Sequence, residues 1–156
     1  MSILLGIDLG ERRIGVAVGD TQSGAVTPLL TLRRASTPEA DAAVIARIGA
    51  ERDASAIVVG LPLHMDGSES EQARRTRGWA AAVEATLDVP LLLQDERLSS
   101  EVARRRLGTP PRGRSGGPPS ERARRAWRAR IDREAAAAIV QAALDQGAHH
   151  RIEVNG

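Results

Sequence analysis

The sequence predicts an α/β protein built on a five-stranded mixed sheet that is flanked by helices. Two observations lead to this fold class. Three successive apolar runs with short connections open the chain, at residues 3–9, 13–19 and 25–32. Helical patterns then alternate with short, continuously apolar runs at 56–60 and 91–94, as in strands covered on both faces. This order favours three antiparallel strands followed by strands that alternate with helices.

Each element has a local signal in the sequence. Pro28 indicates an edge strand or a bulge in the third run, because proline cannot donate to a sheet ladder. Thr37 and Pro38 form a cap and a first-turn proline, and residues 68–71 match a capping box. The apolar stripe of the first helix is expected to contain Ala43, Val44 and Ile48. The predicted helices run from Thr37 to about Arg52, from residue 68 to about Leu87, from Ser99 or Ser100 to Gly108, and up to about Gln146.

The segment from 108 to 120, GTPPRGRSGGPPS, interrupts this regular pattern. Its four prolines and four glycines have no periodicity, which predicts a flexible loop. The chain of 156 residues has no internal repeat and is long enough for one core. We therefore expect a single domain over residues 1–156.

The composition narrows the class of protein. Without cysteine, the chain can form neither disulfides nor thiolate metal sites. We find no signal peptide and no apolar run near the ~20 residues of a membrane span, so we expect a cytoplasmic protein with no membrane partner. The pI of about 10.7 is uninformative, because all 22 basic residues are arginine and the net charge is only +2. Their distribution matters more: 12 arginines lie between Arg97 and Arg133, as expected of a phosphate-binding face.

The stretch LLGIDLGERRIGVAV places Asp8 inside an apolar strand. Strand side chains alternate in direction, so Asp8 lies on a face that carries almost no bulk. The small residues of this face are Gly6, Gly10, Gly15, Ala17 and Gly19. Such a face admits a packed helix or a ligand, and we interpret it as room for a phosphate backbone. The alternative is a structural Asp8 that pairs with an arginine or caps a turn.

Two further positions carry candidate carboxylates. Asp95 and Glu96 directly follow an apolar strand, at the end where α/β sheets bind ligands. Adjacent residues point in opposite directions, so only one of the two is expected to face Asp8; a polar loop is the alternative. Asp132 shares the apolar face of the last helix with Ala136 and Ile139, so it should point inward unless it caps the helix.

Three inward carboxylates on separate elements are best explained as ligands of Mg²⁺ or Mn²⁺, which prefer oxygen ligands. A pair of such ions could activate water and stabilise the leaving oxygen in phosphodiester hydrolysis. The arginine-rich segment before Asp132 would hold the phosphates. The arginines expected to contact nucleic acid are Arg12, Arg13, Arg97, Arg104, Arg105, Arg112, Arg114, Arg124, Arg125 and Arg128.

Four stretches, GIDLGERRIGVAVGD, IVVGLPLHMDGS, QDERLSS and RIDREAAAAIVQAALD, closely resemble the YqgF/RuvX family in order and spacing, over nearly the whole chain. These are RNase H-like proteins described as Holliday junction resolvases and as pre-16S rRNA nucleases. The resemblance implies an RNase H-like fold and a divalent-metal nuclease site at Asp8, Asp132 and Glu96, with Glu96 preferred to Asp95. The chain departs from the family at His64, where asparagine is usual, at Ser99–Ser100, where threonines are usual, and in its longer, arginine-rich segment between residues 112 and 130.

The expected function is therefore a metal-dependent nuclease that acts on structured nucleic acid and processes the 5′ end of pre-16S rRNA, with the small-subunit precursor as a partner. A Holliday junction resolvase of recombination and repair, or a non-catalytic ribosome-assembly factor that binds nucleic acid, are the alternatives. An ATP-binding fold like that of actin and sugar kinases also begins with a strand, DxG and a hairpin, but it needs two such domains. The sequence leaves open whether the chain is a monomer or a homodimer.

Overall fold

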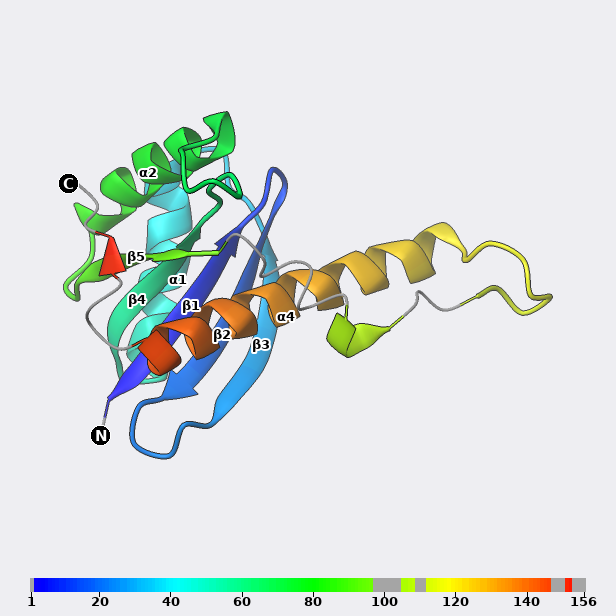
Figure 1. Ribbon diagram of the computed structural model, residues 1–156, viewed down its shortest axis with the longest axis horizontal. Helices are drawn as coiled ribbons and strands as arrows, with labels where there is room; N and C mark the ends of the chain where they lie inside the picture. The colour runs from blue at the N-terminus through cyan, green and yellow to red at the C-terminus, as the bar shows by residue number, and fades with distance from the viewer. Residues whose placement is uncertain (1, 97–104, 109–111, 147–150, 153–156) are drawn as a thin grey trace.

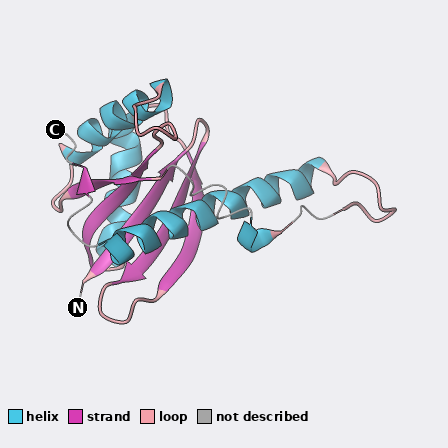
Figure 2. Cartoon of the chain, viewed as in Figure 1, coloured by secondary structure: helices cyan, strands magenta, loops and turns pink. Residues whose placement is uncertain are grey.

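The chain folds into a mixed sheet with helices on both faces, which confirms the predicted fold class (Figure 1 and Figure 2). The computed structural model describes residues 2–96, 105–108, 112–146 and 151–152. The strands follow the order β3-β2-β1-β4-β5-β6 across the sheet. They are β1 (Ile3–Leu9), β2 (Arg13–Asp20), β3 (Val26–Arg33), β4 (Ala54–Leu61), β5 (Leu91–Asp95) and β6 (Arg151–Ile152). The long helices are α1 (Pro38–Glu51), α2 (Glu71–Glu84) and α4 (Glu121–Gln146).

The first three strands form the predicted antiparallel meander. The amide of Gly10 donates to the carbonyl of Arg13 at 2.8 Å and closes the turn between β1 and β2. Strand β3 lies at the edge of the sheet, and its register against β2 shifts at Pro28. Pro28 thus marks both an edge and a bulge, because an edge strand needs fewer backbone donors.

Strands β4 and β5 run parallel to β1 and extend the sheet on its other side. The carboxyl ends of β1, β4 and β5 therefore meet at one edge of the sheet. Strand β6 pairs antiparallel with β5 through two residues and adds a sixth strand to the five that were predicted. A two-residue strand is too short to produce a periodic pattern in the sequence.

Helices α1 and α2 cover one face of the sheet, which we call the α1–α2 face. The Oγ1 of Thr37 accepts from the amide of Ala40 at 3.1 Å, and the Oγ of Ser70 accepts from the amide of Ala73 at 3.0 Å. Helix α1 thus begins where its capping signal predicted, whereas α2 is capped by Ser70, two residues after the start of the predicted capping box at residue 68. Large aliphatic residues of the strands and helices fill this face, among them Leu5, Ile7, Ile14, Val16, Ile45, Ile57, Val59 and Val83, together with Trp79.

The predicted apolar stripe of α1 is confirmed at Ile48 but is wrong at Ala43. The buried residues of this helix are Asp41, Ala42, Ile45, Ile48 and Gly49, whereas Ala43 is exposed and Val44 is only half-buried. Alanines occur on both sides of α1 and tolerate either environment, so its sequence defines the direction of the buried face poorly.

Helix α4 covers the opposite face, which we call the α4 face, and its small side chains bring its backbone close to the strands (Figure 1). A Cβ atom at Gly6 would lie 2.1 Å from Cγ2 of Val140, and one at Gly19 would lie 2.3 Å from Cγ1 of the same residue. A Cβ atom at Gly15 would lie 1.9 Å from the carbonyl oxygen of Asp132. The bare face of the hairpin is thus occupied by α4, and the interpretation of these glycines as room for a phosphate backbone is wrong.

The N-terminal part of α4 extends beyond the sheet (Figure 1). The Oγ of Ser120 accepts from the amide of Ala123 at 3.1 Å at the start of the helix, and the Oγ1 of Thr31 donates to the carbonyl of Ala129 at 2.7 Å where the helix meets β3. Most residues between these two contacts are exposed. A surface helix normally buries one stripe along its length, and this part of α4 buries almost none.

The remaining predictions for this region have mixed outcomes. Residues 105–107 form a helical turn that ends at Gly108 with φ of +74°, in agreement with the predicted glycine terminus. The proposed caps Ser99 and Ser100 lie outside the described residues. The flexibility of the loop at 108–120 stays a prediction. Within the described ranges, no helix is both long and apolar enough to cross a bilayer.

Candidate active site

Asp8 lies near the carboxyl end of β1, on the side that faces α4. It pairs in register with Gly15 of β2, and its side chain is partly buried. Neighbouring Ile7 and Leu9 belong to the core of the α1–α2 face, as the alternation of strand side chains requires. The direction predicted for Asp8 is therefore confirmed.

Glu96 directly follows β5 and brings a second carboxyl group to this point. Its backbone amide donates to the carbonyl of Leu61 at 3.1 Å, and its side chain is hydrogen-bonded to that of Asp8. A Cβ atom at Gly60 would lie 2.7 Å from Cδ of Glu96, so the glycine clears the space that this carboxyl group occupies. Asp95 pairs in register with Leu61 at the end of β5. Glu96 is thus the member of the pair that reaches Asp8.

Asp132 brings the third carboxyl group from α4. Helix α4 begins about three turns before this residue, so the alternative of a helix cap is wrong. The inward direction is confirmed, because Ala136 and Ile139 on the same face are buried against the sheet. The absence of a side chain at Gly15 allows the helix backbone to approach β2 at Asp132. The Nε of Arg13, at the start of β2, donates to Oδ2 of Asp132 at 2.6 Å.

The electrostatics of Asp8 reflect the convergence of these groups. Burial and the nearby charge of Asp132 raise the pKa of Asp8 from 3.8 to about 6, and the hydrogen bond from Glu96 partly opposes this increase. The pKa of Asp8 is therefore set by its burial and by the two carboxyl groups beside it. The metal-free protein therefore concentrates negative charge at the point where β1, β5 and α4 meet.

The donor chemistry of this cluster fits a hard divalent cation, since all three side chains offer carboxylate oxygens. A cation would also relieve the repulsion that raises the pKa of Asp8. Among the residues that the structure describes, however, no three acidic or histidine side chains are gathered closely enough to hold a metal ion as they stand. Asp132 is turned to Arg13 instead.

The comparison with known families decides the relationship of the chain. A family model described as "RuvX: Holliday junction resolvase" matches residues 2–146. The chain belongs to the RuvX family. This result confirms the resemblance that the four motifs indicated, and it assigns the chain to a class of hydrolases that act on nucleic acids.

Relatives of this family member match over most of their length. A protein of Anaeromyxobacter dehalogenans named "Putative pre-16S rRNA nuclease" is 44% identical over 144 residues, which are 92% of this chain and 97% of the relative. A protein of Rhodobacter capsulatus with the same name is 39% identical over 146 residues, which are 94% of this chain and 85% of the relative. The structure of Thermus thermophilus RuvC in complex with a Holliday junction substrate superposes with a TM-score of 0.53, at 14% identity, and covers 97% of this chain and 100% of that one. This structural likeness supports the RNase H-like fold.

The predicted nucleic-acid arginines fall into three groups. Arg13 is bonded to Asp132, while Arg12 is exposed in the turn before β2. Arg97 and Arg104 lie outside the described residues. The others are exposed, and most lie on or before the protruding part of α4: Arg105, Arg112, Arg114, Arg124, Arg125 and Arg128. Most of this set therefore lies at a distance from the carboxylates along α4 (Figure 1).

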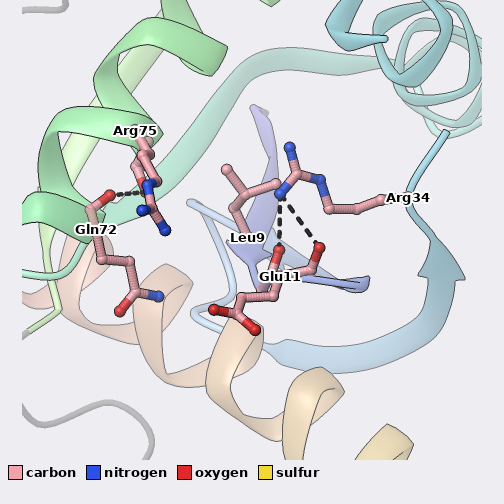
Figure 3. Close-up of a pocket in the computed structure, with 7 residues that line it drawn as sticks. Leu9, Glu11, Arg34, Gln72 and Arg75 are labelled. Carbon is pink, nitrogen blue, oxygen red and sulfur yellow. Dashed lines mark hydrogen bonds between the residues drawn. The ribbon is translucent and has the colours of Figure 1, made fainter. Parts of the chain in front are cut away.

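A pocket that the sequence analysis missed opens on the other side of the β1–β2 turn (Figure 3). Its volume is about 520 Å³, and its lining residues are Leu9, Gly10, Glu11, Arg34, Gln72, Arg75 and Thr76. Figure 3 shows Arg34 donating to the carbonyls of Gly10 and Glu11, at 3.2 and 3.4 Å. Arg34 thus braces the turn that separates Asp8 from Arg13.

Asp41 supports Arg34 from the buried side of α1 and was also missed. Its side chain is 3% exposed and accepts from the amide of Ala35 at 2.7 Å and from Nε1 of Trp79 at 3.0 Å. The Nε of Arg34 lies 3.9 Å from its Oδ2. Asp41 lies at helical spacing from Ile45, so the reasoning that selected Asp132 could also have selected this residue.

Proposed function

We propose that the chain is a divalent-metal-dependent nuclease that hydrolyses phosphodiester bonds in structured nucleic acid, with the 5′ end of pre-16S rRNA as its substrate. The observation that carries this proposal is the convergence of Asp8, Glu96 and Asp132 from three separate elements at one edge of the sheet. Buried like charges are costly, so a fold that gathers them without function would be destabilised. Membership of the RuvX family supports the same chemistry.

Asp8, Glu96 and Asp132 would hold Mg²⁺ or Mn²⁺, as a pair of ions. When bound, such ions stabilise the charge that develops on the scissile phosphate as Lewis acids. The three carboxylates bind and orient the ions, and Gly60 keeps the position of Glu96 open. Because the pKa of Asp8 is raised to about 6, a cation would compete with a proton for this carboxyl group.

The protruding arginines would hold the nucleic-acid backbone away from the carboxylates. Helix α4 has 26 residues and is therefore about 39 Å long, so its exposed end can contact phosphates well beyond the scissile bond. Arginine contacts of this kind add affinity and position without reading sequence. This arrangement favours a folded or branched substrate, because its shape presents phosphates at several positions.

The choice of pre-16S rRNA follows the names of the similar proteins from Anaeromyxobacter and Rhodobacter. A Holliday junction resolvase is the second candidate, favoured by the description of the family model. The test is a cleavage assay with Mn²⁺ on three substrates: a precursor 16S fragment with its 5′ extension, a four-way DNA junction and single-stranded DNA. We expect cleavage of the precursor, while preferential cleavage of the junction would establish the second candidate. The lengths of the products distinguish endonuclease from exonuclease action.

The matched variant in this assay is Asp8→Asn, which keeps the size of the side chain and removes its charge. We expect loss of cleavage with retained folding and nucleic-acid binding. Full activity of Asp8→Asn would overturn the proposed site. Nucleic-acid binding by the wild-type protein without cleavage of any substrate would favour the non-catalytic assembly factor.

The role of the protruding arginines has its own test. The triple variant Arg124→Gln, Arg125→Gln, Arg128→Gln should weaken binding and lower the salt slope of binding by about 2 to 3, since each phosphate contact contributes about 0.9. The control variant Arg47→Gln, Arg52→Gln, Arg74→Gln removes the same charge from exposed positions on or beside α1 and α2. Equal salt slopes for the two variants would rule out a specific contact by α4.

A further inference from the structure

Arg13 was expected to contact nucleic acid, but the structure gives it a partner inside the candidate active site. Its Nε donates to Oδ2 of Asp132 at 2.6 Å, a short distance for a charged pair. The side chain of Arg13 is 36% exposed and that of Asp132 is 18% exposed, so the pair lies at the boundary between the site and solvent. Arg13 can therefore reach either Asp132 or a group that approaches from outside.

The backbone positions of Arg13 and Asp132 are set by contacts that do not involve their ion pair. It is the first residue of β2, and its carbonyl closes the turn after Gly10. Asp132 is fixed against the same strand by the close approach of α4 at Gly15. The backbone of both partners is thus held in place, and only the long side chain of Arg13 needs to move to break the pair.

The charges around this pair favour an exchange. Asp8, with a hydrogen bond from Glu96, interacts with the charge of Asp132, and Arg13 supplies a positive charge to that group. A divalent cation bound to the same carboxylates would repel the guanidinium and would compete with it for the oxygen of Asp132.

We infer that Arg13 holds Asp132 in the metal-free protein, releases it when Mg²⁺ or Mn²⁺ binds, and then contacts a phosphate of the substrate strand. This inference rests on the proposed function, because it needs a metal site at these carboxylates. Arg13 keeps Asp132 oriented and screens its charge until the cation arrives. When the cation displaces Arg13 from Asp132, the freed guanidinium becomes available to bind a phosphate of the substrate.

A purely structural role for Arg13 makes the opposite prediction for metal affinity. If Arg13 only orients Asp132, its removal should weaken metal binding, because the carboxylate loses its position. If Arg13 competes with the cation, its removal should strengthen metal binding. The sign of the change separates the two roles and does not depend on catalysis.

The test is calorimetric titration of Mn²⁺ into the wild-type protein, Arg13→Gln, Arg13→Lys and the control Arg33→Gln, after circular dichroism has established that each variant is folded. Arg33 is exposed and pairs in register with Arg13, so its variant removes the same charge close by without touching Asp132. We expect Arg13→Gln to bind Mn²⁺ about fivefold or more tightly than Arg33→Gln, as for loss of one unit charge near the site. Arg13→Lys keeps the charge and should bind like the wild type.

Equal or weaker Mn²⁺ binding by Arg13→Gln than by Arg33→Gln would overturn the inference. The proposed function fails separately, if the wild-type protein binds no Mn²⁺ or if Asp8→Asn binds it as well as the wild type does. A second measurement concerns the substrate: Arg13→Gln should cleave more slowly than the wild type at saturating Mn²⁺. Unchanged cleavage at saturating Mn²⁺ would overturn the proposed contact of Arg13 with phosphate.

Discussion

The two faces of the sheet hold their helices in different ways. On the α1–α2 face, the strands present branched aliphatic side chains such as Ile14 and Val16, and the core is filled by side-chain volume. On the α4 face, Gly15 has no side chain, and the backbone of α4 occupies the position where one would lie. Consecutive residues of one strand, Ile14 and Gly15, thus serve two different kinds of packing.

This difference shows how one sheet can combine stability with a polar site. Most of the largest buried side chains lie on the α1–α2 face. Close backbone contact on the α4 face brings Asp132 to Asp8, which a layer of large side chains would keep apart. The α1–α2 face should therefore be sensitive to the removal of atoms, and the α4 face to their addition.

The largest expected effect is that of Gly15→Ala. The new Cβ atom would meet the carbonyl oxygen of Asp132, a backbone atom that cannot move without the helix. We expect a loss of about 3 kcal/mol or more in the free energy of unfolding, at the upper end for overpacked sites, together with loss of cleavage. Urea denaturation measures the first effect, and the Mn²⁺ assay measures the second.

The control for this substitution is Gly78→Ala in α2, where a Cβ atom would meet nothing within 4 Å. Alanine favours the helix more than glycine does, so this variant should be more stable by about 0.5 to 1 kcal/mol. A stable and active Gly15→Ala would show that α4 does not depend on close backbone contact.

The second effect concerns Asp8 in the metal-free protein, measured with a chelator present. Because the folded-state pKa of Asp8 is raised to about 6 from 3.8, the folded protein binds a proton that the unfolded chain has already lost between these values. The wild type should therefore lose stability as the pH rises from about 4 to 6, and Asp8→Asn should lack this loss. Allowing for partial exposure of Asp8, we expect Asp8→Asn to gain about 1 to 2 kcal/mol relative to the wild type between pH 4 and pH 7.

Urea denaturation of both proteins across this pH range provides the measurement. Groups other than Asp8 and its neighbours titrate equally in the two proteins, so their contribution cancels in the difference. A difference in unfolding free energy that does not change with pH would mean that the charge of Asp8 is not destabilising in the metal-free fold.

The smallest effect is that of Ile14→Val on the α1–α2 face. Ile14 is 1% exposed, and the substitution removes one methylene group from the core. We expect a loss of about 1 kcal/mol and unchanged cleavage, since this side chain points away from Asp132. Thermal unfolding and the Mn²⁺ assay test the two expectations. A change in cleavage comparable to that of Gly15→Ala would mean that the two faces are not independent.

Local patterns in the sequence predicted much of the fold and the inward direction of the candidate carboxylates. The cap Thr37 marked the start of α1 correctly, because a cap acts on amides only two or three residues away, whereas the box at 68–71 placed the start of α2 two residues before its cap, Ser70. The alternation of β1 and the helical repeat around Asp132 established which way these carboxylates point. The alanine-rich pattern of α1 was less informative, so the buried Asp41 and its contact with Trp79 were missed.

The sequence by itself determined the five longer strands, the long helices and the inward direction of Asp8 and Asp132, because these properties depend on neighbours within a few residues. Only the tertiary structure decided what each face meets. The hydrogen bond from Arg13 to Asp132 joins residues 119 positions apart, and it depends on how far α4 slides and rotates over β2. The same packing decided that the glycines of the hairpin receive a helix, because a missing side chain marks a close approach without identifying what approaches.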